Sequence, residues 1–316
     1  MNIAVVGAGA MGSIYAALLS EAGHTVWAID PNAAHIEAIN RDGLSLTGPT
    51  GTKRYTALRG ATAPAQVGAD LGGPVDLIVL ATKAAHVAPA VQGLAPLLGD
   101  ETTLLAMQNG LGAAERVAQN LPQTSAPVHV ALGVAQGFGA SVLGPGSVKF
   151  ANMKLMRFGE THDGDSPAME RIAQIWRDAG FQAQAFANLG QLIWEKFICN
   201  VTLSAPCTVF GQTVGDMRAV PEQWQIALNC GLEAYRVGQA QGIAFSFEDA
   251  EAYITQFADS VAGAKPSMLQ DFEAGRRSEI DVINGRVPVE AAKAGMTAPW
   301  NQVLSDIIRA KEAAFS

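Results

Sequence analysis

The stretch Asn2–Gly12, NIAVVGAGAMG, decides the fold of this chain. Its first half is a short apolar run, rich in β-branched residues, that ends in glycine, and residues 11–22 then follow a helical pattern. The glycines between these two segments match the pattern G-x-G-x-x-G. A strand, a glycine turn and a helix in this order predict the start of a parallel α/β sheet.

The alternation of strands and helices continues through the first half of the chain. This repetition predicts a Rossmann-type, doubly wound parallel sheet. The glycine-rich segment 137–159 is expected to add antiparallel strands to that sheet. Further strands are expected at 24–29, 75–81, 103–107, 128–134 and 182–187, with helices at 32–41, 112–119 and 166–179.

Beyond about residue 188 the strand signals fade and helical periodicity takes over. We therefore expect a dinucleotide-binding domain over residues 1–187 and an all-helical substrate domain over 188–316. The helices of the second domain are expected at 189–208, 222–241, 247–262, 278–294 and 300–312.

Composition excludes several classes of partner. Apolar residues make up 49% of the 316 residues and the net charge is −8, which predicts a globular protein that binds neither nucleic acid nor an anionic membrane. The three cysteines form no C-x-x-C pair, which is typical of buried, reduced thiols in a cytoplasmic protein. The five histidines are scattered and predict no metal site.

The glycine turn predicts a site for a pyrophosphate. Gly7 allows the tight turn, Gly9 lets the backbone approach the phosphates, and Gly12 permits close packing of the helix on the strand. Ala10 and Met11, within the motif, are also expected to bind the cofactor at the start of the helix, whose N-terminus favours negative charge. A packing turn without a ligand is the alternative.

Asp30 ends the second strand, and the following residues, PNAA, supply no cation. A carboxylate at this position accepts hydrogen bonds from the ribose hydroxyls and repels a 2′-phosphate. The sequence therefore favours NAD(H) over NADP(H). Asp30 could also simply cap the next helix.

A second polar pattern lies in IWEKFICNVTLS, residues 193–204, where Lys196, Asn200 and Ser204 follow one another at steps of four in an apolar helix. A buried lysine is costly unless it is paired or used. The pattern alone leaves open a lysine that reaches solvent beside two satisfied polar groups.

Polar residues also follow two of the predicted strands. Lys83 and Asn109 come after the strands at 75–81 and 103–107, at the edge where open α/β sheets bind ligands. Spacing alone does not distinguish a ligand-binding Lys83 from an ordinary surface lysine, or a ligand-binding Asn109 from the first residue of a plain Asn-Gly turn. Near the end of the chain, Ser267 and Glu279 are expected at the starts of two helices.

Together these segments resemble the ketopantoate reductase family. The matching stretches are GAGAMG at 7–12, ATK at 81–83, QNGLG at 108–112, GPGSV at 144–148, WEKFICN at 194–200 and SMLQDFEAGRRSEIDVING at 267–285. The resemblance implies a Rossmann domain followed by a helical domain, and the transfer of hydride between a nicotinamide and a small 2-oxo or 2-hydroxy acid, as in pantothenate biosynthesis.

The resemblance also implies roles for individual residues. Lys196 looks like the family's catalytic lysine, and Glu279 matches its acidic active-site residue. Asn109 matches an asparagine near nicotinamide and substrate. Asn200 and Ser267 match substrate-binding residues, and Lys83 a lysine near the cofactor. A homodimer remains open.

Two departures from the family pattern bear on substrate and cofactor. Ser204 stands where pantoate-pathway members often carry a second substrate-binding asparagine, so the substrate stays open. Asp30 stands where NADPH-using members commonly have arginine, although the resemblance keeps NADP(H) open. An NAD-preferring member could instead oxidise a 2-hydroxy acid, with neutral Lys196 as the base.

Two other classes remain as alternatives. The β-hydroxyacid dehydrogenases, which act on 3-hydroxy acids, also combine G-x-G-x-M-G with a lysine four residues before an asparagine. They usually carry D-x-P-V-S-G-G, where this chain has HVALGVAQGFGASVLGPGSV at 129–148. A non-catalytic redox sensor that binds a dinucleotide is the third reading, and retention of the lysine with its polar partners disfavours it.

Overall fold

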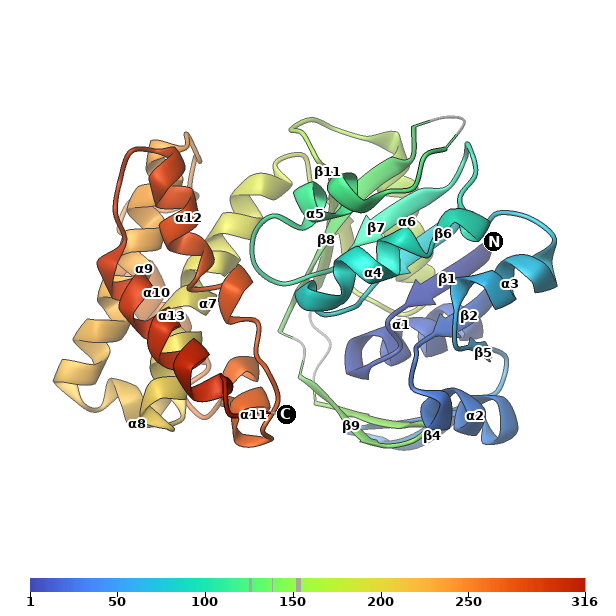
Figure 1. Cartoon of the computed structure of the whole chain (residues 1–316), viewed down its shortest axis with the longest axis horizontal. Coiled ribbons are helices and arrows are strands. Elements are labelled where there is room, and N and C mark those ends of the chain that lie inside the picture. The colour runs from blue at the N-terminus through green and yellow to red at the C-terminus, as the bar shows by residue number, and fades with distance from the viewer. Residues whose placement is uncertain (125–126, 138, 152–154, 316) are drawn as a thin grey trace. The chain divides into compact units, whose positions relative to one another are not determined.

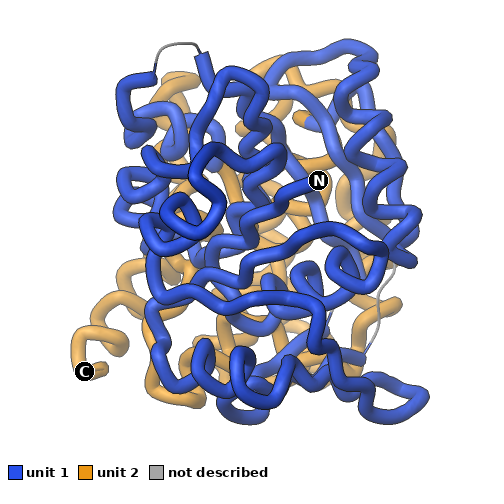
Figure 2. The backbone as a smooth tube through the Cα atoms, turned by 90° about the vertical axis from the view of Figure 1, so that its right-hand side faces the viewer, with its two compact units in different colours: residues 1–108, 113–189 blue, residues 109–112, 190–316 orange. Residues whose placement is uncertain are grey.

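The computed structural model describes residues 1–124, 127–137, 139–151 and 155–315. The chain forms two compact units, which Figure 2 draws in different colours. Unit 1 comprises Met1–Gln108 and Ala113–Leu189, and unit 2 comprises Asn109–Gly112 and Gly190–Ser316. The assignment of separate functions to residues 1–187 and 188–316 stays a prediction.

Unit 1 is built on an eight-stranded sheet in the order β12-β11-β8-β7-β6-β1-β2-β5 (Figure 1). The six strands from β8 to β5 are parallel, and β11 joins β8 in the antiparallel sense. The predicted parallel sheet is confirmed, as is one antiparallel addition. The strands are β1 (Asn2–Val6), β2 (Thr25–Ile29), β5 (Arg59–Ala61), β6 (Leu77–Leu80), β7 (Thr103–Ala106), β8 (His129–Gln136), β11 (Leu155–Glu160) and β12 (Ala183–Ala185).

Both faces of this sheet are covered, which explains its continuous apolar strands. Alternate residues of β1 enter different cores: Ile3 and Val5 join one, and Ala4 and Val6 the other. Helices α1, α2 and α6 line the first core, and α3, α4 and α5 the second. The helices are α1 (Ala10–Glu21), α2 (Ala33–Asp42), α3 (Pro64–Leu71), α4 (Val87–Gln92), α5 (Ala113–Asn120) and α6 (Pro167–Asp178), with short 3-10 turns η1 (Ala84–His86) and η2 (Ala95–Leu97).

A second sheet corrects part of the prediction for residues 137–159. Strands β9 (Ala140–Gly144) and β10 (Ser147–Phe150) form a hairpin that pairs with β3 (Leu44–Gly48) and β4 (Gly51–Tyr55) in the order β4-β3-β10-β9. They do not extend the main sheet as expected, because the alternating pattern of a strand does not specify its partner. Residues 138 and 152–154 of this segment lie outside the described part of the chain.

Unit 2 is helical, as predicted. One expected helix is wrong: residues 278–294 form a 3-10 turn and a shorter helix, separated at Ile283–Gly285. Within the part of the chain that the structure describes, no helix is long and apolar enough to span a membrane. The elements are α7 (Leu189–Phe210), α8 (Val214–Arg218), α9 (Pro221–Ala240), α10 (Ala250–Ser260), α11 (Ser267–Glu273), η3 (Ile280–Val282), α12 (Arg286–Lys293) and α13 (Pro299–Glu312).

Candidate functional site

The glycine turn of unit 1 joins β1 to α1 in a conformation that requires glycine. Gly7 has a φ of +92°, and a Cβ at this position would lie 2.6 Å from the backbone nitrogen of Thr82. A Cβ on Gly12 would lie 2.0 Å from the Gly7 carbonyl oxygen. Both glycines are therefore needed for the turn itself, whether or not a ligand binds.

Gly9 differs from its two neighbours. It is exposed, and a Cβ built there would meet no atom within 4 Å. Ala10 and Met11, both half-buried, open helix α1, which has no acidic residue in its first turn and no side-chain cap. The turn thus leaves open space at an uncapped helix N-terminus, which fits the pyrophosphate of a dinucleotide.

Polar groups at the ends of β2, β6 and β7 complete this part of unit 1. Asp30 is half-buried, and its Oδ1 accepts a hydrogen bond of 3.0 Å from the backbone N–H of Asn32. Lys83 is exposed at the start of η1, next to the Thr82 that touches the glycine turn. The predicted cofactor residues therefore lie at the carboxyl ends of parallel strands.

Gln108 was not singled out from the sequence. Its Nε2 donates to the carbonyl oxygens of Leu80 and Thr82, at 2.8 and 3.2 Å, and so ties the ends of β6 and β7 together. Its Oε1 and the Thr82 Oγ1 are buried without a hydrogen-bond partner. Such buried orphan atoms are rare in folded proteins and fit a site that takes a polar ligand.

In unit 2, Lys196 lies on α7 and its amine donates a hydrogen bond of 2.8 Å to the side-chain oxygen of Asn109. Although the residue keeps some exposed surface, protein surrounds the amine closely. Burial lowers the pKa of Lys196 to about 8, and the negative charge of Glu279 opposes this shift. Lys196 is therefore poised between its charged and neutral forms near physiological pH.

The loop 109–112 brings Asn109 to this lysine. Gly110 has a φ of +79°, and a Cβ there would lie 2.1 Å from the carbonyl oxygen of Val282. The backbone N–H of Leu111 donates to the same oxygen at 3.2 Å. Because Val282 closes the η3 turn that begins after Glu279, the loop and the glutamate are held by one local structure.

The other predicted residues of unit 2 are Asn200, Ser204 and Ser267. Asn200 is half-buried one turn beyond Lys196, and Ser204 is buried one turn further on, with 4% of its surface exposed. Ser267 is exposed at the first residue of α11. The structure thus brings Asn109 and Glu279 to Lys196. Asn200 and Ser204 lie on the same helix as this lysine. A role for Ser267 rests on the resemblance alone.

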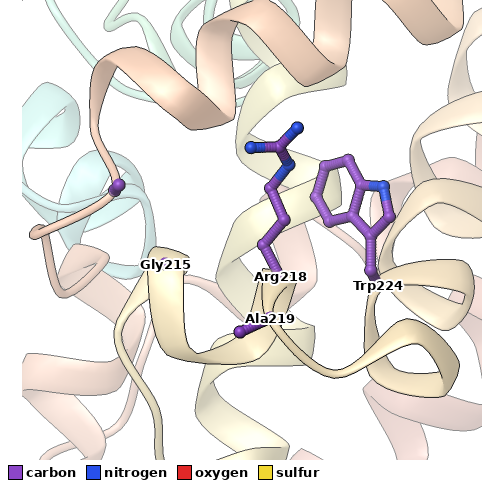
Figure 3. Close-up of a pocket in the computed structure, with 5 residues that line it drawn as sticks. Gly215, Arg218, Ala219 and Trp224 are labelled. Carbon is purple, nitrogen blue, oxygen red and sulfur yellow. The ribbon is translucent and has the colours of Figure 1, made fainter.

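A surface hollow of about 450 Å³ in unit 2 contains none of the predicted residues (Figure 3). Gly215, Arg218, Ala219, Trp224 and Ala262 line it. The Arg218 guanidinium pairs with Asp259 and lies 5.5 Å from the centre of the Trp224 ring. These contacts stabilise the surface of the helical unit and offer no group suited to hydride transfer.

Comparison with known proteins gives matches along nearly the whole chain. Residues 3–163 match the model of the family "Ketopantoate reductase PanE/ApbA", and residues 188–312 match "Ketopantoate reductase PanE/ApbA C terminal". The chain is 27% identical to the 2-dehydropantoate 2-reductase of Streptococcus pyogenes serotype M1, over 99% of this chain and 98% of that protein.

The 2-dehydropantoate 2-reductase of Mesorhizobium japonicum is 31% identical, over 90% of this chain and 89% of that protein. Among solved structures, D-mandelate dehydrogenase in a ternary structure with NADH and anilino(oxo)acetate has a TM-score of 0.88 and 25% identity, covering 100% of this chain and 99% of that one. On the strength of both family matches and of these full-length relatives, the chain belongs to the ketopantoate reductase family.

Proposed function

We propose that this protein is a nicotinamide-dependent oxidoreductase that reduces a small 2-oxo acid to the 2-hydroxy acid, with 2-dehydropantoate as the first candidate. The observation that carries the proposal is the amine of Lys196, hydrogen-bonded to Asn109, close to the charge of Glu279 and with a pKa of about 8. The names of the curated relatives supply the candidate substrate.

Lys196 acts as the general acid in this proposal. Its ammonium form polarises the ketone oxygen and gives that oxygen a proton as hydride reaches the carbon. Asn109 accepts a hydrogen bond from the amine and so aims it, and Glu279 favours the charged form. In the oxidative direction neutral Lys196 takes the proton back from the hydroxyl group.

Substrate recognition is assigned to the polar residues around the lysine. Asn200 and Ser204 would bind the polar groups of the substrate from the face of α7, and Ser267 would help hold its carboxylate. Ser204, in place of an asparagine, shortens the reach of α7 at that point. The substrate panel therefore includes 2-oxo acids whose side chains differ in size or polarity from that of 2-dehydropantoate.

The nicotinamide cofactor supplies or accepts the hydride when bound. Gly7, Gly9, Ala10, Met11 and Gly12 would hold its pyrophosphate at the start of α1, with Lys83 and Asn109 near other parts of it. The open space over Gly9 and the orphan polar atoms nearby support this fit. Asp30 favours NAD(H), because its carboxylate suits free ribose hydroxyls and repels a 2′-phosphate.

A second candidate is an NAD-dependent dehydrogenase of a different 2-hydroxy acid. Asp30 supports it, as does the likeness to D-mandelate dehydrogenase, whose structure holds NADH. A 3-hydroxy acid substrate is a weaker alternative, because residues 129–148 lack the D-x-P-V-S-G-G segment. A non-catalytic redox sensor is weaker too, because the lysine and both of its polar partners are retained.

A spectrophotometric panel tests these proposals together. Purified protein is assayed with 2-dehydropantoate, aliphatic and aromatic 2-oxo acids, the matching 2-hydroxy acids and a set of 3-hydroxy acids, each with both cofactors. The main proposal predicts the highest kcat/KM for a 2-oxo acid with NADH. Faster turnover of a 3-hydroxy acid, or no turnover of any substrate beside tight cofactor binding, would favour the alternatives.

A further inference from the structure

Helix α7, which carries Lys196, Asn200 and Ser204, contains Pro206 within its span. Proline has no N–H to donate to the carbonyl four residues earlier, and its ring crowds that carbonyl, here of Thr202. A helix opens or bends at such a position. The hydrogen-bond ladder of α7 is therefore weakened between Thr202 and Pro206, on either side of Ser204.

Asn284 is inserted at this point. Its Nδ2 donates a hydrogen bond of 2.8 Å to the carbonyl oxygen of Val201, and its Oδ1 accepts one of 3.3 Å from the backbone N–H of Ala205. These are the two groups that would bond to each other in an undisturbed α-helix. The side-chain amide of Asn284, which is fully buried, thus joins the two sides of one turn of α7.

A buried network holds this amide in one orientation. The second hydrogen of the Asn284 Nδ2 goes to the Oδ1 of Asn301 at 2.9 Å, and the Asn301 Nδ2 donates to Cys230 O and to Glu233 Oε2, at 3.0 and 2.8 Å. The Glu233 carboxylate also accepts the backbone N–H groups of Trp300 and Asn301, each at 3.0 Å. Turning the Asn284 amide over would set its NH2 against the Ala205 N–H and its oxygen against the Val201 carbonyl, so the network specifies its direction.

The position of the insertion points to a role beyond stability. Lys196 and Asn200 lie before the bridged turn, and Ser204 lies inside it, between Val201 and Ala205. Lys196 is fixed separately through Asn109. The amide of Asn284 is therefore bonded to the turn that holds Ser204.

We propose that Asn284 is a positioning residue for substrate recognition, which sets the spacing of the polar stripe by bridging the two sides of the turn that holds Ser204. The proposal rests on the proposed function. It explains why Ile283–Gly285 interrupts the helix expected over 278–294, since Asn284 must point its side chain into α7.

The test is a double-mutant cycle of Asn284→Ala and Pro206→Ala on the full chain, with the best 2-oxo acid from the panel. In the wild-type background Asn284→Ala should raise the KM for the 2-oxo acid roughly tenfold with kcat within about threefold, because a displaced Ser204 would lose binding that the ground state and the transition state share. Pro206→Ala supplies an N–H for the Thr202 carbonyl and so strengthens the same stretch of helix without Asn284. Asn284→Ala should therefore change the KM for the 2-oxo acid much less in that background. The Kd for the dinucleotide should be constant throughout.

Additive effects in the cycle, or a lowered melting temperature with unchanged KM, would show that Asn284 only stabilises unit 2. If Asn284→Ala does not fold, Pro206→Ala decides. The new hydrogen bond to the Thr202 carbonyl should straighten the turn that holds Ser204, move this serine and raise the KM for the 2-oxo acid, and an unchanged KM overturns the proposal. A wild-type protein that reduces no 2-oxo acid would instead refute the proposed function, which separates the two failures.

Discussion

Lys196 and Asn109 are 87 positions apart in the chain, yet the lysine amine donates a hydrogen bond of 2.8 Å to the asparagine side-chain oxygen. The contact exists because the loop 109–112 packs on the carbonyl of Val282 through Gly110 and Leu111. One hydrogen bond thus links the segments QNGLG and WEKFICN, and η3 after Glu279 supports it. The following predictions depend on this arrangement and on the glycine turn.

Replacement of Lys196 by alanine should lower kcat by about 10²- to 10⁴-fold, because the general acid is lost. The Kd for the dinucleotide, measured by fluorescence titration, should stay within about twofold, since the predicted cofactor residues other than Asn109 lie in unit 1. Lys311→Ala, which removes an exposed lysine from α13, is the matched control. Unchanged turnover in Lys196→Ala would sink the assignment of the general acid.

The pH dependence should follow the titration of Lys196. Reduction needs the ammonium form of Lys196, so kcat/KM for the 2-oxo acid should fall as pH rises through about 8. Oxidation needs the neutral amine, so kcat/KM for the 2-hydroxy acid should rise over the same range. Glu279 raises the pKa of the lysine, so Glu279→Gln should move both profiles to lower pH. Steady-state kcat/KM values measured across pH in buffers of constant ionic strength test this prediction. If the pH profiles of the wild type and of Glu279→Gln coincide, the role of Glu279 is contradicted.

Asp30→Arg should shift cofactor preference toward NADP(H). The guanidinium would attract a 2′-phosphate where the carboxylate repelled it, so the ratio of kcat/KM for NADPH to that for NADH should rise roughly tenfold or more. Asp165→Arg, an exposed change of the same charge in unit 1, should leave the ratio unaltered. A wild-type enzyme that already prefers NADPH would refute this interpretation of Asp30.

Alanine substitutions at Gly7 and Gly9 should affect different properties, the stability of the fold at Gly7 and cofactor binding at Gly9. Gly7→Ala places a Cβ 2.6 Å from the Thr82 nitrogen at a φ of +92° and should lower the free energy of unfolding even without cofactor. The strain amounts to about 1–3 kcal/mol. Gly9→Ala meets no atom within 4 Å, so its melting temperature should match the wild type while its dinucleotide Kd rises. Thermal unfolding with and without cofactor checks both, and normal binding by Gly9→Ala would argue against a pyrophosphate there.

Local features of the sequence were sufficient for much of the fold. The strands and helices of the parallel sheet follow from the change between apolar runs and helical periodicity, and the first turn follows from its glycines. These signals are local because backbone conformation and side-chain burial repeat over a few residues. The hairpin β9–β10 shows the limit, since the same alternating pattern fits either sheet and only packing against β3 selects one.

The sequence by itself thus determined a Rossmann-type sheet, a helical second half, a glycine turn suited to a dinucleotide, and a polar stripe with Lys196, Asn200 and Ser204. Only the tertiary structure decided that Lys196 donates to Asn109, that burial lowers the pKa of this lysine while Glu279 opposes the shift, and that Asn284 bridges Val201 and Ala205 on either side of Ser204. The reason is that burial, hydrogen bonding and charge at a site depend on residues distant in the chain, whose approach no local pattern encodes.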